Sequence, residues 1–371
     1  HASGYTGRFA PTPSGPLHAG SMVAALASWL DARTQRGRWL VRIEDVDAPR
    51  CVPGTAEIIL AQLDACGLRP DEPVLFQSTR NERYSALLQR LLDAGQVYPC
   101  TCSRGAIALA RARAGTGGVP HQERIYPGTC RPRPMGVTPA LMTGLMTRPS
   151  AERSDANANA NANANANANA NANANANAGT DVDVDVDVDA NGDGHIDGDG
   201  APRPVAWRLL TQGAQGRGID IDWFDRRLGV QHQNVTRDVG DFVLKRADGL
   251  WAYQLAVVID DADQGVTDVV RGEDLADNTA RQIHLQGVLG LPALRYLHTP
   301  LVRAADGQKL SKQTGARAVD VQTPLHALAT LRDAARTLGL PTDLCSGDDG
   351  ARSPSEWLAR CTAAWAANAR R

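Results

Sequence analysis

Two short stretches at opposite ends of the chain carry residue types that suit the binding of phosphate groups. They are His18-Ala19-Gly20-Ser21 and Lys309-Leu310-Ser311-Lys312. The first precedes a segment with apolar residues at helical spacing, and a helix N-terminus offers unpaired N–H groups to an anion. Two lysines beside a serine can neutralise the charge that develops on phosphates during phosphoryl transfer. The pair therefore predicts a nucleotide site, with Ser21 as the N-cap of the helix.

A strand, helix, strand unit at the start of the chain is expected to position the first stretch. Such a unit is typical of parallel nucleotide-binding sheets. Further along the chain, an Asp248-Gly249 turn predicts a hairpin, and Ser353 is a candidate cap for a helix that begins at Pro354. Strands are expected at residues 5–10, 39–43, 242–245, 251–255 and 266–270, and helices from His18 and at 53–63, 84–92, 274–289, 324–338 and 354–367.

The charge of the chain is unevenly distributed. The formal net charge is -2, but residues 151–201 hold ten acidic side chains and one arginine, so the remainder has 38 basic and 31 acidic residues. A net charge of +7 outside this segment makes an anionic polymer such as RNA a plausible partner. No apolar run of 18 residues occurs, so no membrane association and a cytoplasmic location are expected.

Residues 151–203 contain long alternations of Ala with Asn and of Asp with Val. Neither tract can bury enough apolar surface to offset chain entropy, which predicts a disordered insertion without a catalytic role. Within it, Asp189–Asp197 matches the first nine positions of an EF-hand calcium loop. Gly200 stands where a bidentate Glu is wanted, so the match is either a calcium site or an accident of low complexity.

The seven cysteines are an odd number in a long chain, which argues against a disulfide framework. Cys100, Cys102 and Cys130 are candidate zinc ligands, although three reduced cysteines without a metal remain an alternative. From donor chemistry alone, His121 is the preferred fourth ligand, because imidazole is a common zinc donor and phenol is rare.

The two phosphate-binding stretches, in this order, resemble the nucleotide signatures of class I aminoacyl-tRNA synthetases. Arg8–Gly15, Arg42–Asp47, Val270–Asp274 and Trp251–Ala256 resemble the motifs of the glutamyl branch. The resemblance covers nearly all of residues 4–135 and 204–320. It implies an α/β fold with a Rossmann-like parallel sheet, a zinc-binding insertion and a short helical C-terminal part.

The resemblance also implies roles for individual residues. Arg8 and Arg271 would hold carboxylates of L-glutamate, Glu44 its amino group and Tyr253 the substrate through its hydroxyl. It favours Tyr126 over His121 as the fourth ligand of one structural zinc ion. Magnesium is expected with ATP. The implied catalytic residues are His18, Lys309 and Lys312, and the residues implied to bind ATP are His18, Gly20, Ser21, Ser311 and Lys312. The residues implied to bind glutamate are Arg8, Ala10, Ser14, Glu44, Tyr253 and Arg271. The residues implied to bind zinc are Cys100, Cys102, Tyr126 and Cys130.

The 58 residues after Gln313 are too few for a large anticodon-binding domain. With the Cys-x-Cys, Tyr, Cys arrangement, this resembles the glutamyl-Q tRNA(Asp) synthetases, which activate glutamate without tRNA and transfer it to queuosine in tRNA(Asp). The alternatives are a truncated glutamyl-tRNA synthetase that charges a tRNA 3′ end and a non-catalytic RNA-binding relative. A monomer is expected.

The resemblance also implies a domain organisation. Residues 1–99 and 204–320 are expected to form the two halves of the catalytic domain, and the second half carries the lysine loop. Residues 100–150 are expected to form the zinc-binding insertion, 151–203 the disordered insertion and 321–371 a helical segment.

Overall fold

A computed structural model describes residues 4–113, 125–132, 204–213, 216–303, 317–346 and 350–368. The chain divides into two compact units. The first comprises His1–Asn81, Ile221–His232 and Ala256–Arg371, and the second comprises Glu82–Asp220 and Gln233–Leu255. The predicted low-complexity insertion, with its candidate calcium loop, lies outside the described residues.

The first unit is built on a seven-stranded sheet with the order β3-β2-β1-β9-β10-β6-β7. Strands β3, β2, β1, β9, β10 and β6 pair in parallel, which confirms the predicted parallel sheet. The expected strands at 5–10 and 39–43 are β1 and β2. The strands are β1 (Thr6–Phe9), β2 (Arg38–Ile43), β3 (Leu75–Phe76), β6 (Asp220–Asp225), β7 (Gly229–Asn234), β9 (Asp268–Gly272) and β10 (Arg295–Thr299).

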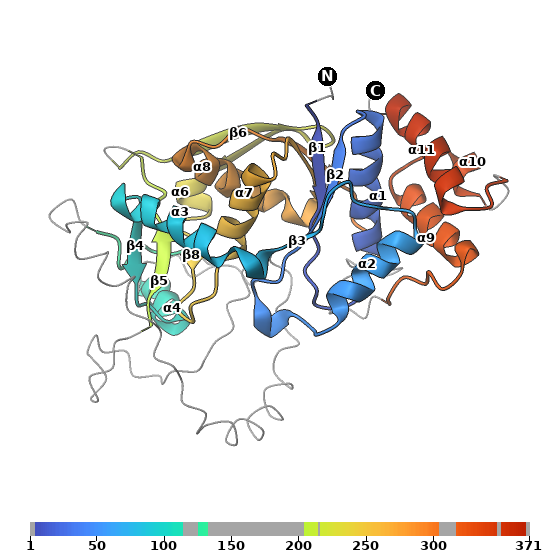
Figure 1. The fold of residues 1–371 in the computed structure, drawn as a ribbon. Helices are drawn as coiled ribbons and strands as arrows, with labels where there is room; N and C mark the ends of the chain where they lie inside the picture. The colour runs from blue at the N-terminus through green and yellow to red at the C-terminus, as the bar shows by residue number, and fades with distance from the viewer. Residues whose placement is uncertain are drawn as a thin grey trace, which may run out of the picture. The chain divides into compact units, whose positions relative to one another are not determined.

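Helices of the first unit build its main core around α1 (Ala19–Thr34). α1 packs against β1 and β9 and against the C-terminal helices α9 and α11, which Figure 1 shows in red beside it. Most apolar side chains of α1 are buried in this core, whereas Ala24 and Trp29 are partly exposed. The remaining helices are α2 (Thr55–Ala65), α8 (Thr279–Leu289), α9 (Pro324–Thr337), α10 (Thr342–Cys345) and α11 (Pro354–Asn368), with 3₁₀ turns at Ala48–Arg50, Gln77–Arg80 and Glu273–Asn278.

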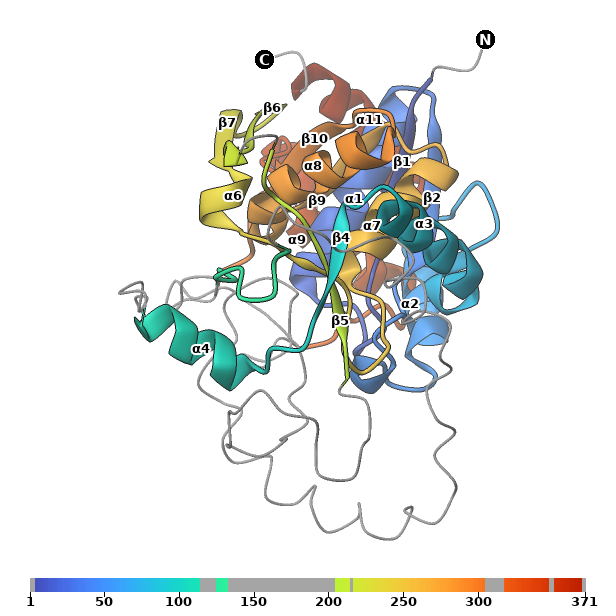
Figure 2. The same ribbon diagram turned by 90° about the vertical axis from the view of Figure 1, so that its left-hand side faces the viewer.

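The second unit contains a three-stranded antiparallel sheet with the order β4-β5-β8. Figure 2 shows β4 beside β5, although more than a hundred residues separate them in the chain. The amphipathic helix predicted at 84–92 is α3, and its apolar stripe is buried. The elements are α3 (Asn81–Asp93), β4 (Val97–Cys100), α4 (Arg104–Arg113), β5 (Ala206–Leu209), α6 (Val235–Asp238) and β8 (Val243–Lys245).

Three predictions of local structure were wrong. The second strand of the hairpin is limited to a bridge between Trp251 and Lys245, because the chain from Tyr253 to Asp263 forms helix α7. Pro53 precedes α2 instead of starting it, and Gly54 caps that helix in the left-handed conformation. The helix expected from Asp274 begins with a 3₁₀ segment, and α8 starts at Thr279.

The helix starts predicted in the C-terminal segment are confirmed. Ser353 Oγ accepts the N–H of Glu356 at 3.3 Å, as expected of an N-cap, and α9 begins at Pro324 after Thr323.

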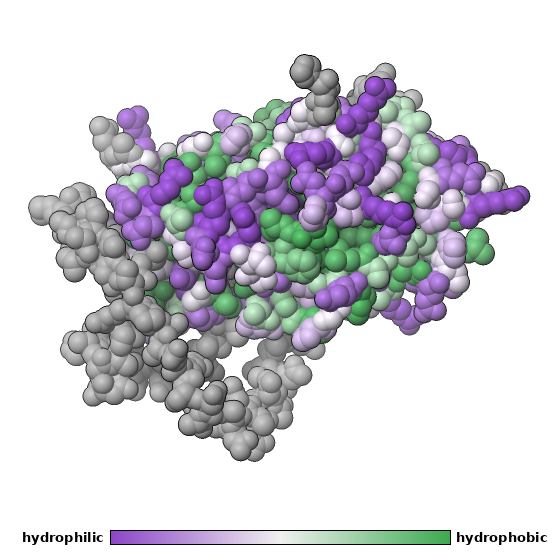
Figure 3. Space-filling view, in the orientation of Figure 1, coloured by the Kyte–Doolittle hydropathy of each residue, from purple (hydrophilic) through white to green (hydrophobic). Residues whose placement is uncertain are grey.

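Figure 3 shows hydrophilic and hydrophobic residues mixed on one face. Among the described residues, none of the helices combines the length and the apolar character needed to cross a membrane.

Candidate functional site

The turn between β1 and α1 places the first phosphate-binding stretch at a helix N-terminus. Its N-cap is His18, whose backbone is extended and whose Nδ1 accepts the N–H of Ser21 at 3.3 Å. The prediction that Ser21 caps the helix was therefore wrong, because the imidazole supplies the acceptor one turn earlier. Gly20 and Ser21 lie in the first turn, where N–H groups face the space before the helix.

The segment that follows the predicted lysine loop returns to this turn. Ala318 forms an antiparallel bridge with His18, and Val319 N–H donates to the Leu17 carbonyl at 2.9 Å. Residues 318 and 319, which follow the second stretch in the sequence, thus lie beside the first. Lys309, Ser311 and Lys312 themselves lie outside the described residues, and their roles stay predictions.

A buried charge cluster surrounds Arg8 on β1. Arg8 binds Asp261 of α7 in a bidentate pair, with Nε 3.0 Å from Oδ1 and Nη2 3.2 Å from Oδ2. Arg42 of β2 donates to the same carboxylate. Burial would raise the pKa of Asp261, but the two guanidinium groups hold it below its ordinary value. Asp261 therefore fixes Arg8 and Arg42 at the centre of the sheet.

Glu44 directly follows β2 and borders this cluster. Its side chain is 7% exposed, and its Oε1 lies 3.8 Å from Arg42 Nε and has no hydrogen-bond partner among the described residues. Burial raises the pKa of Glu44 to about 7, although Arg42 and Arg8 oppose this shift. A buried carboxylate with an unsatisfied oxygen suits a cationic substrate group such as an ammonium.

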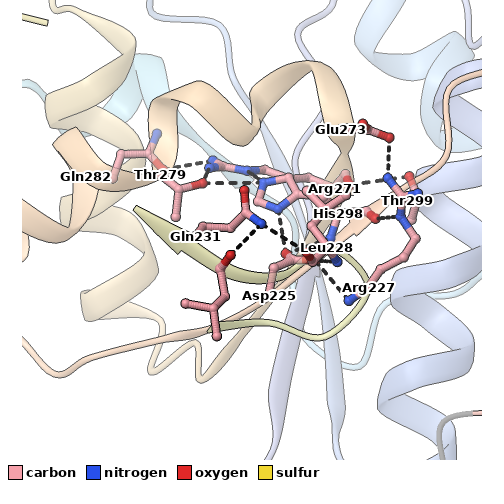
Figure 4. Close-up of polar contacts among 11 residues, drawn as sticks. Asp225, Arg227, Leu228, Gln231, Arg271, Glu273, Thr279, Gln282, His298 and Thr299 are labelled. Carbon is pink, nitrogen blue, oxygen red and sulfur yellow. Dashed lines mark hydrogen bonds and ion pairs between the residues drawn. The ribbon is translucent and has the colours of Figure 1, made fainter. Parts of the chain in front are cut away.

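Arg271 lies on β9, next to β1 in the sheet, and is held by a separate network (Figure 4). Its Nε donates to His298 Nε2 at 3.1 Å, and its Nη atoms donate to Gln282 at 2.8 Å and Thr279 at 2.9 Å. His298 Nδ1 is 2.7 Å from the buried carboxylate of Asp225. A guanidinium held on several sides presents a fixed fork, the geometry that binds a carboxylate in a bidentate manner.

The other residues predicted to bind glutamate occupy two places. Ala10 follows β1 and is half-buried, and Ser14 is exposed in the turn before His18. Tyr253 is the first residue of α7 and belongs to the second unit. The first unit thus brings Arg8, Glu44 and Arg271 to the carboxyl ends of neighbouring parallel strands, where open α/β sheets bind ligands.

Sequence reasoning missed three residues that hold these arginines. Asp261 lies in the segment after the mispredicted hairpin, where a charged pair at the end of an apolar run was a usable signal. Asp225 and His298 contact one another from strands more than seventy residues apart. His298 lies in the short strand β10 (Arg295–Thr299), and nothing near it in the sequence identifies its partners.

The second unit assembles the predicted metal ligands. The sulfurs of Cys100, Cys102 and Cys130 lie within 4.8 Å of one another and could bind a metal ion. The Tyr126 hydroxyl lies 3.4 Å from Cys100 Sγ and 3.7 Å from Cys102 Sγ, and it accepts the N–H of Cys130 at 2.7 Å. His121, the alternative fourth ligand, lies outside the described residues.

The surroundings of this cysteine cluster favour one thiolate, at Cys100, and raise the pKa of Cys102 through hydrogen bonding with Cys100 and burial. Hydrogen bonding from Cys102 lowers the pKa of Cys100 to about 4, against the effect of burial. The Arg208 guanidinium stacks on the Tyr126 ring, 4.0 Å from its centroid, and orients the phenol. Three sulfurs that lie this close together could serve as donors to a metal ion, with the Tyr126 oxygen next to them.

Comparisons with known proteins agree on one family. The chain matches the family described as tRNA synthetases class I (E and Q), catalytic domain, over residues 6–132 and 225–334. A relative from Leptothrix cholodnii, named glutamyl-Q tRNA(Asp) synthetase, is 50% identical over 98% of this chain and 97% of its own length. A relative of the same name from Albidiferax ferrireducens is 49% identical over 92% of this chain and 94% of its own length.

Solved structures extend the likeness to the fold. The glutamate-tRNA synthetase of Elizabethkingia anophelis matches with a TM-score of 0.59 at 24% identity, covering 84% of this chain and 53% of that one. The chain therefore spans about half the length of that synthetase.

Proposed function

Because the chain belongs to the glutamyl-Q tRNA(Asp) synthetases within the class I tRNA synthetase family, we propose that it activates L-glutamate with ATP and transfers the glutamyl group to queuosine of tRNA(Asp). The observation that carries the proposal in the structure is the arrangement of Glu44 and Arg271 at the carboxyl ends of β2 and β9. One offers a buried anion and the other a fixed cation, as an amino acid requires.

Activation begins with glutamate in this site. Glu44 holds the ammonium group, Arg8 and Arg271 hold carboxylates, and Ala10 and Ser14 belong to the same unit as these residues. Tyr253 binds the substrate through its hydroxyl. Because Arg8 is already paired with Asp261 through two of its N–H groups, it acts on the substrate mainly through its positive charge.

ATP binds across the two phosphate-binding stretches. His18 and the first turn of α1, with Gly20 and Ser21, receive the nucleotide, and Lys309, Ser311 and Lys312 approach its phosphates. A carboxylate oxygen of glutamate attacks the α-phosphorus, and the bond to the bridging oxygen breaks, which releases pyrophosphate and leaves glutamyl-adenylate. Magnesium bound with ATP would neutralise phosphate charge.

The second step transfers the glutamyl group. A hydroxyl of the queuosine cyclopentenediol attacks the carbonyl carbon of the adenylate, an ester bond forms, and AMP leaves. The modified base must be presented outside the helical stack of the RNA to reach the carbonyl. Zinc held by Cys100, Cys102, Tyr126 and Cys130 would supply folding energy to the second unit and takes no part in the chemistry.

Glutamate-dependent ATP–pyrophosphate exchange without RNA tests the activation step. Exchange with L-glutamate as the amino acid supports it, and exchange that requires tRNA contradicts tRNA-independent activation. No exchange under either condition would favour the alternative of a non-catalytic RNA-binding protein.

A further inference from the structure

Arg271 is connected to a buried carboxylate through a histidine. The chain of contacts runs from Arg271 Nε to His298 Nε2 at 3.1 Å and from His298 Nδ1 to Asp225 Oδ2 at 2.7 Å. All three side chains are buried, and His298 and Asp225 are fully so. Figure 4 shows the imidazole between the guanidinium and the carboxylate. The two charges are thus linked through a ring instead of a direct ion pair.

The donors and acceptors fix the tautomer of His298. An arginine Nε–H can only donate, so His298 Nε2 must accept, and the ring proton must sit on Nδ1 and be donated to Asp225. Burial and the charge of Arg271 hold the pKa of His298 below its ordinary value, although Asp225 opposes them. The ring is therefore neutral at neutral pH, as its acceptor role requires.

Asp225 is itself immobilised at the end of β6. Its Oδ1 accepts the N–H groups of Arg227 and Leu228 at 2.9 and 2.8 Å, and its Oδ2 accepts the N–H of His298 at 3.1 Å. A carboxylate that receives several backbone donors cannot rotate without losing them. The fixed carboxylate of Asp225 therefore orients the His298 ring through a hydrogen bond, and the ring in turn orients the plane of the Arg271 guanidinium.

We propose that Asp225 and His298 are positioning residues that orient Arg271 toward a carboxylate of glutamate. The proposal rests on the proposed function, because it assigns the pair to the same substrate site. Bidentate recognition of a carboxylate depends on the plane of the guanidinium, and Thr279 and Gln282 contact only its far nitrogens. The acceptor at Nε is what fixes the remaining rotation of this plane.

The test compares two substitutions at one position. In His298→Gln, the amide oxygen can still accept from Arg271 Nε, whereas His298→Leu has a similar volume and no acceptor. We expect His298→Leu to raise KM for glutamate about ten- to a hundredfold and to leave KM for ATP within about twofold, because only the glutamate site is misaligned. His298→Gln should keep KM for glutamate within about threefold of the wild type.

A merely structural role would give another pattern. Exchange rates are therefore divided by the fraction of chains that form glutamyl-adenylate at saturating glutamate. Misfolded chains form no adenylate and so do not enter the comparison. Trp357→Phe, a buried change on α11 that removes the hydrogen bond from the indole N–H to the Leu344 carbonyl, serves as a control and should leave KM for glutamate unchanged. If His298→Leu does not fold, Asp225→Asn provides the same comparison, with a smaller expected rise in KM because Asn keeps one acceptor.

The outcomes separate the two proposals. A wild-type KM for glutamate in the folded fraction of both His298→Leu and Asp225→Asn overturns the positioning role. Equal rises in His298→Leu and His298→Gln also overturn it, since acceptor loss would then not be the cause. Absence of glutamate-dependent exchange in the wild-type enzyme would instead contradict the proposed function.

Discussion

Replacement of Glu44 by Gln is expected to change substrate binding and stability in opposite directions. The substitution keeps the shape of the side chain and removes the charge that we assign to the glutamate ammonium. Loss of one partner of a buried charge pair costs about 2–5 kcal/mol, so kcat/KM for glutamate should fall roughly 30-fold to several thousandfold. Glu57→Gln, an exposed change on α2, is the matched control and should have little effect.

The pH dependence gives the magnitude of the Glu44 effect. With a pKa of about 7, Glu44 is about one-tenth ionised at pH 6 and about nine-tenths ionised at pH 8 in the free enzyme. Because the ionised form binds the ammonium, kcat/KM for glutamate should rise about tenfold between these pH values. Burial lowers the pKa of His298 from its ordinary value, so its titration shifts toward the acid end of this interval. In Glu44→Gln this rise should disappear.

The free energy of unfolding should also depend on the ionisation of Glu44, but it should fall with rising pH, whereas kcat/KM rises. The pKa of Glu44 is raised from 4.5 to about 7 on folding, so the folded state binds more protons than the unfolded state between these values. The free energy of unfolding should therefore fall by about 3 kcal/mol as pH rises through this window, and Glu44→Gln should lack that fall. Urea titrations from pH 4.5 to 8 measure it. A Glu44→Gln enzyme with wild-type kcat/KM at pH 8 would refute the assignment of Glu44 to the substrate.

Three further predictions concern other parts of the chain. Lys312→Ala should lower glutamate-dependent ATP–pyrophosphate exchange at least about a hundredfold, because it removes a cation that stabilises the developing phosphate charge; near-normal exchange would contradict this role. Asp261→Asn should lower the free energy of unfolding by about 3–5 kcal/mol in urea titration, because Arg8 and Arg42 lose their shared buried counter-charge, and a loss below about 1 kcal/mol would contradict it. Cys130→Ser should abolish the binding of about one zinc per chain, measured by atomic emission, whereas Cys51→Ser should retain it; unchanged metal content in Cys130→Ser would exclude the site.

The parts of the fold that the sequence predicted well are those with strong local signals. The strands β1 and β2 are short and flank a helix in the order of a strand, helix, strand unit, and α3 shows an apolar stripe at helical spacing. Helix α11 has a serine cap and a proline in its first turn. In each case one segment contains the information that decides its own structure.

The failures arise where distant contacts decide the structure. α7 was predicted as a strand at its start because Trp251 to Leu255 is apolar and aromatic, yet the helix is buried on most sides and has no polar stripe to reveal its period. The hairpin of β6 and β7 was missed for the same reason of tertiary context. Ser21 was expected to cap α1, with His18 as a cap only in the alternative interpretation, since histidine is an uncommon N-cap.

The candidate site shows the same division. The sequence motifs identified Arg8, Glu44 and Arg271, whose residue types indicate the substrate chemistry. The residues that hold these side chains, Asp261 and His298 among them, reach them from other elements. The end of an apolar run marked Asp261, but its contact with Arg8 depends on the position of α7. The contact of His298 with Arg271 depends on the pairing of β9 with β10.

Transfer of labelled glutamate to tRNA(Asp) tests the central claim most directly. Two preparations of this tRNA, one with queuosine and one with guanosine at the same position, are incubated with the enzyme, ATP and glutamate. The mass of the anticodon fragment is then measured by mass spectrometry. The account predicts that the fragment gains the mass of one glutamyl group only when queuosine is present. Glutamate attached to the 3′ end of a tRNA, with none on the anticodon fragment, would contradict it.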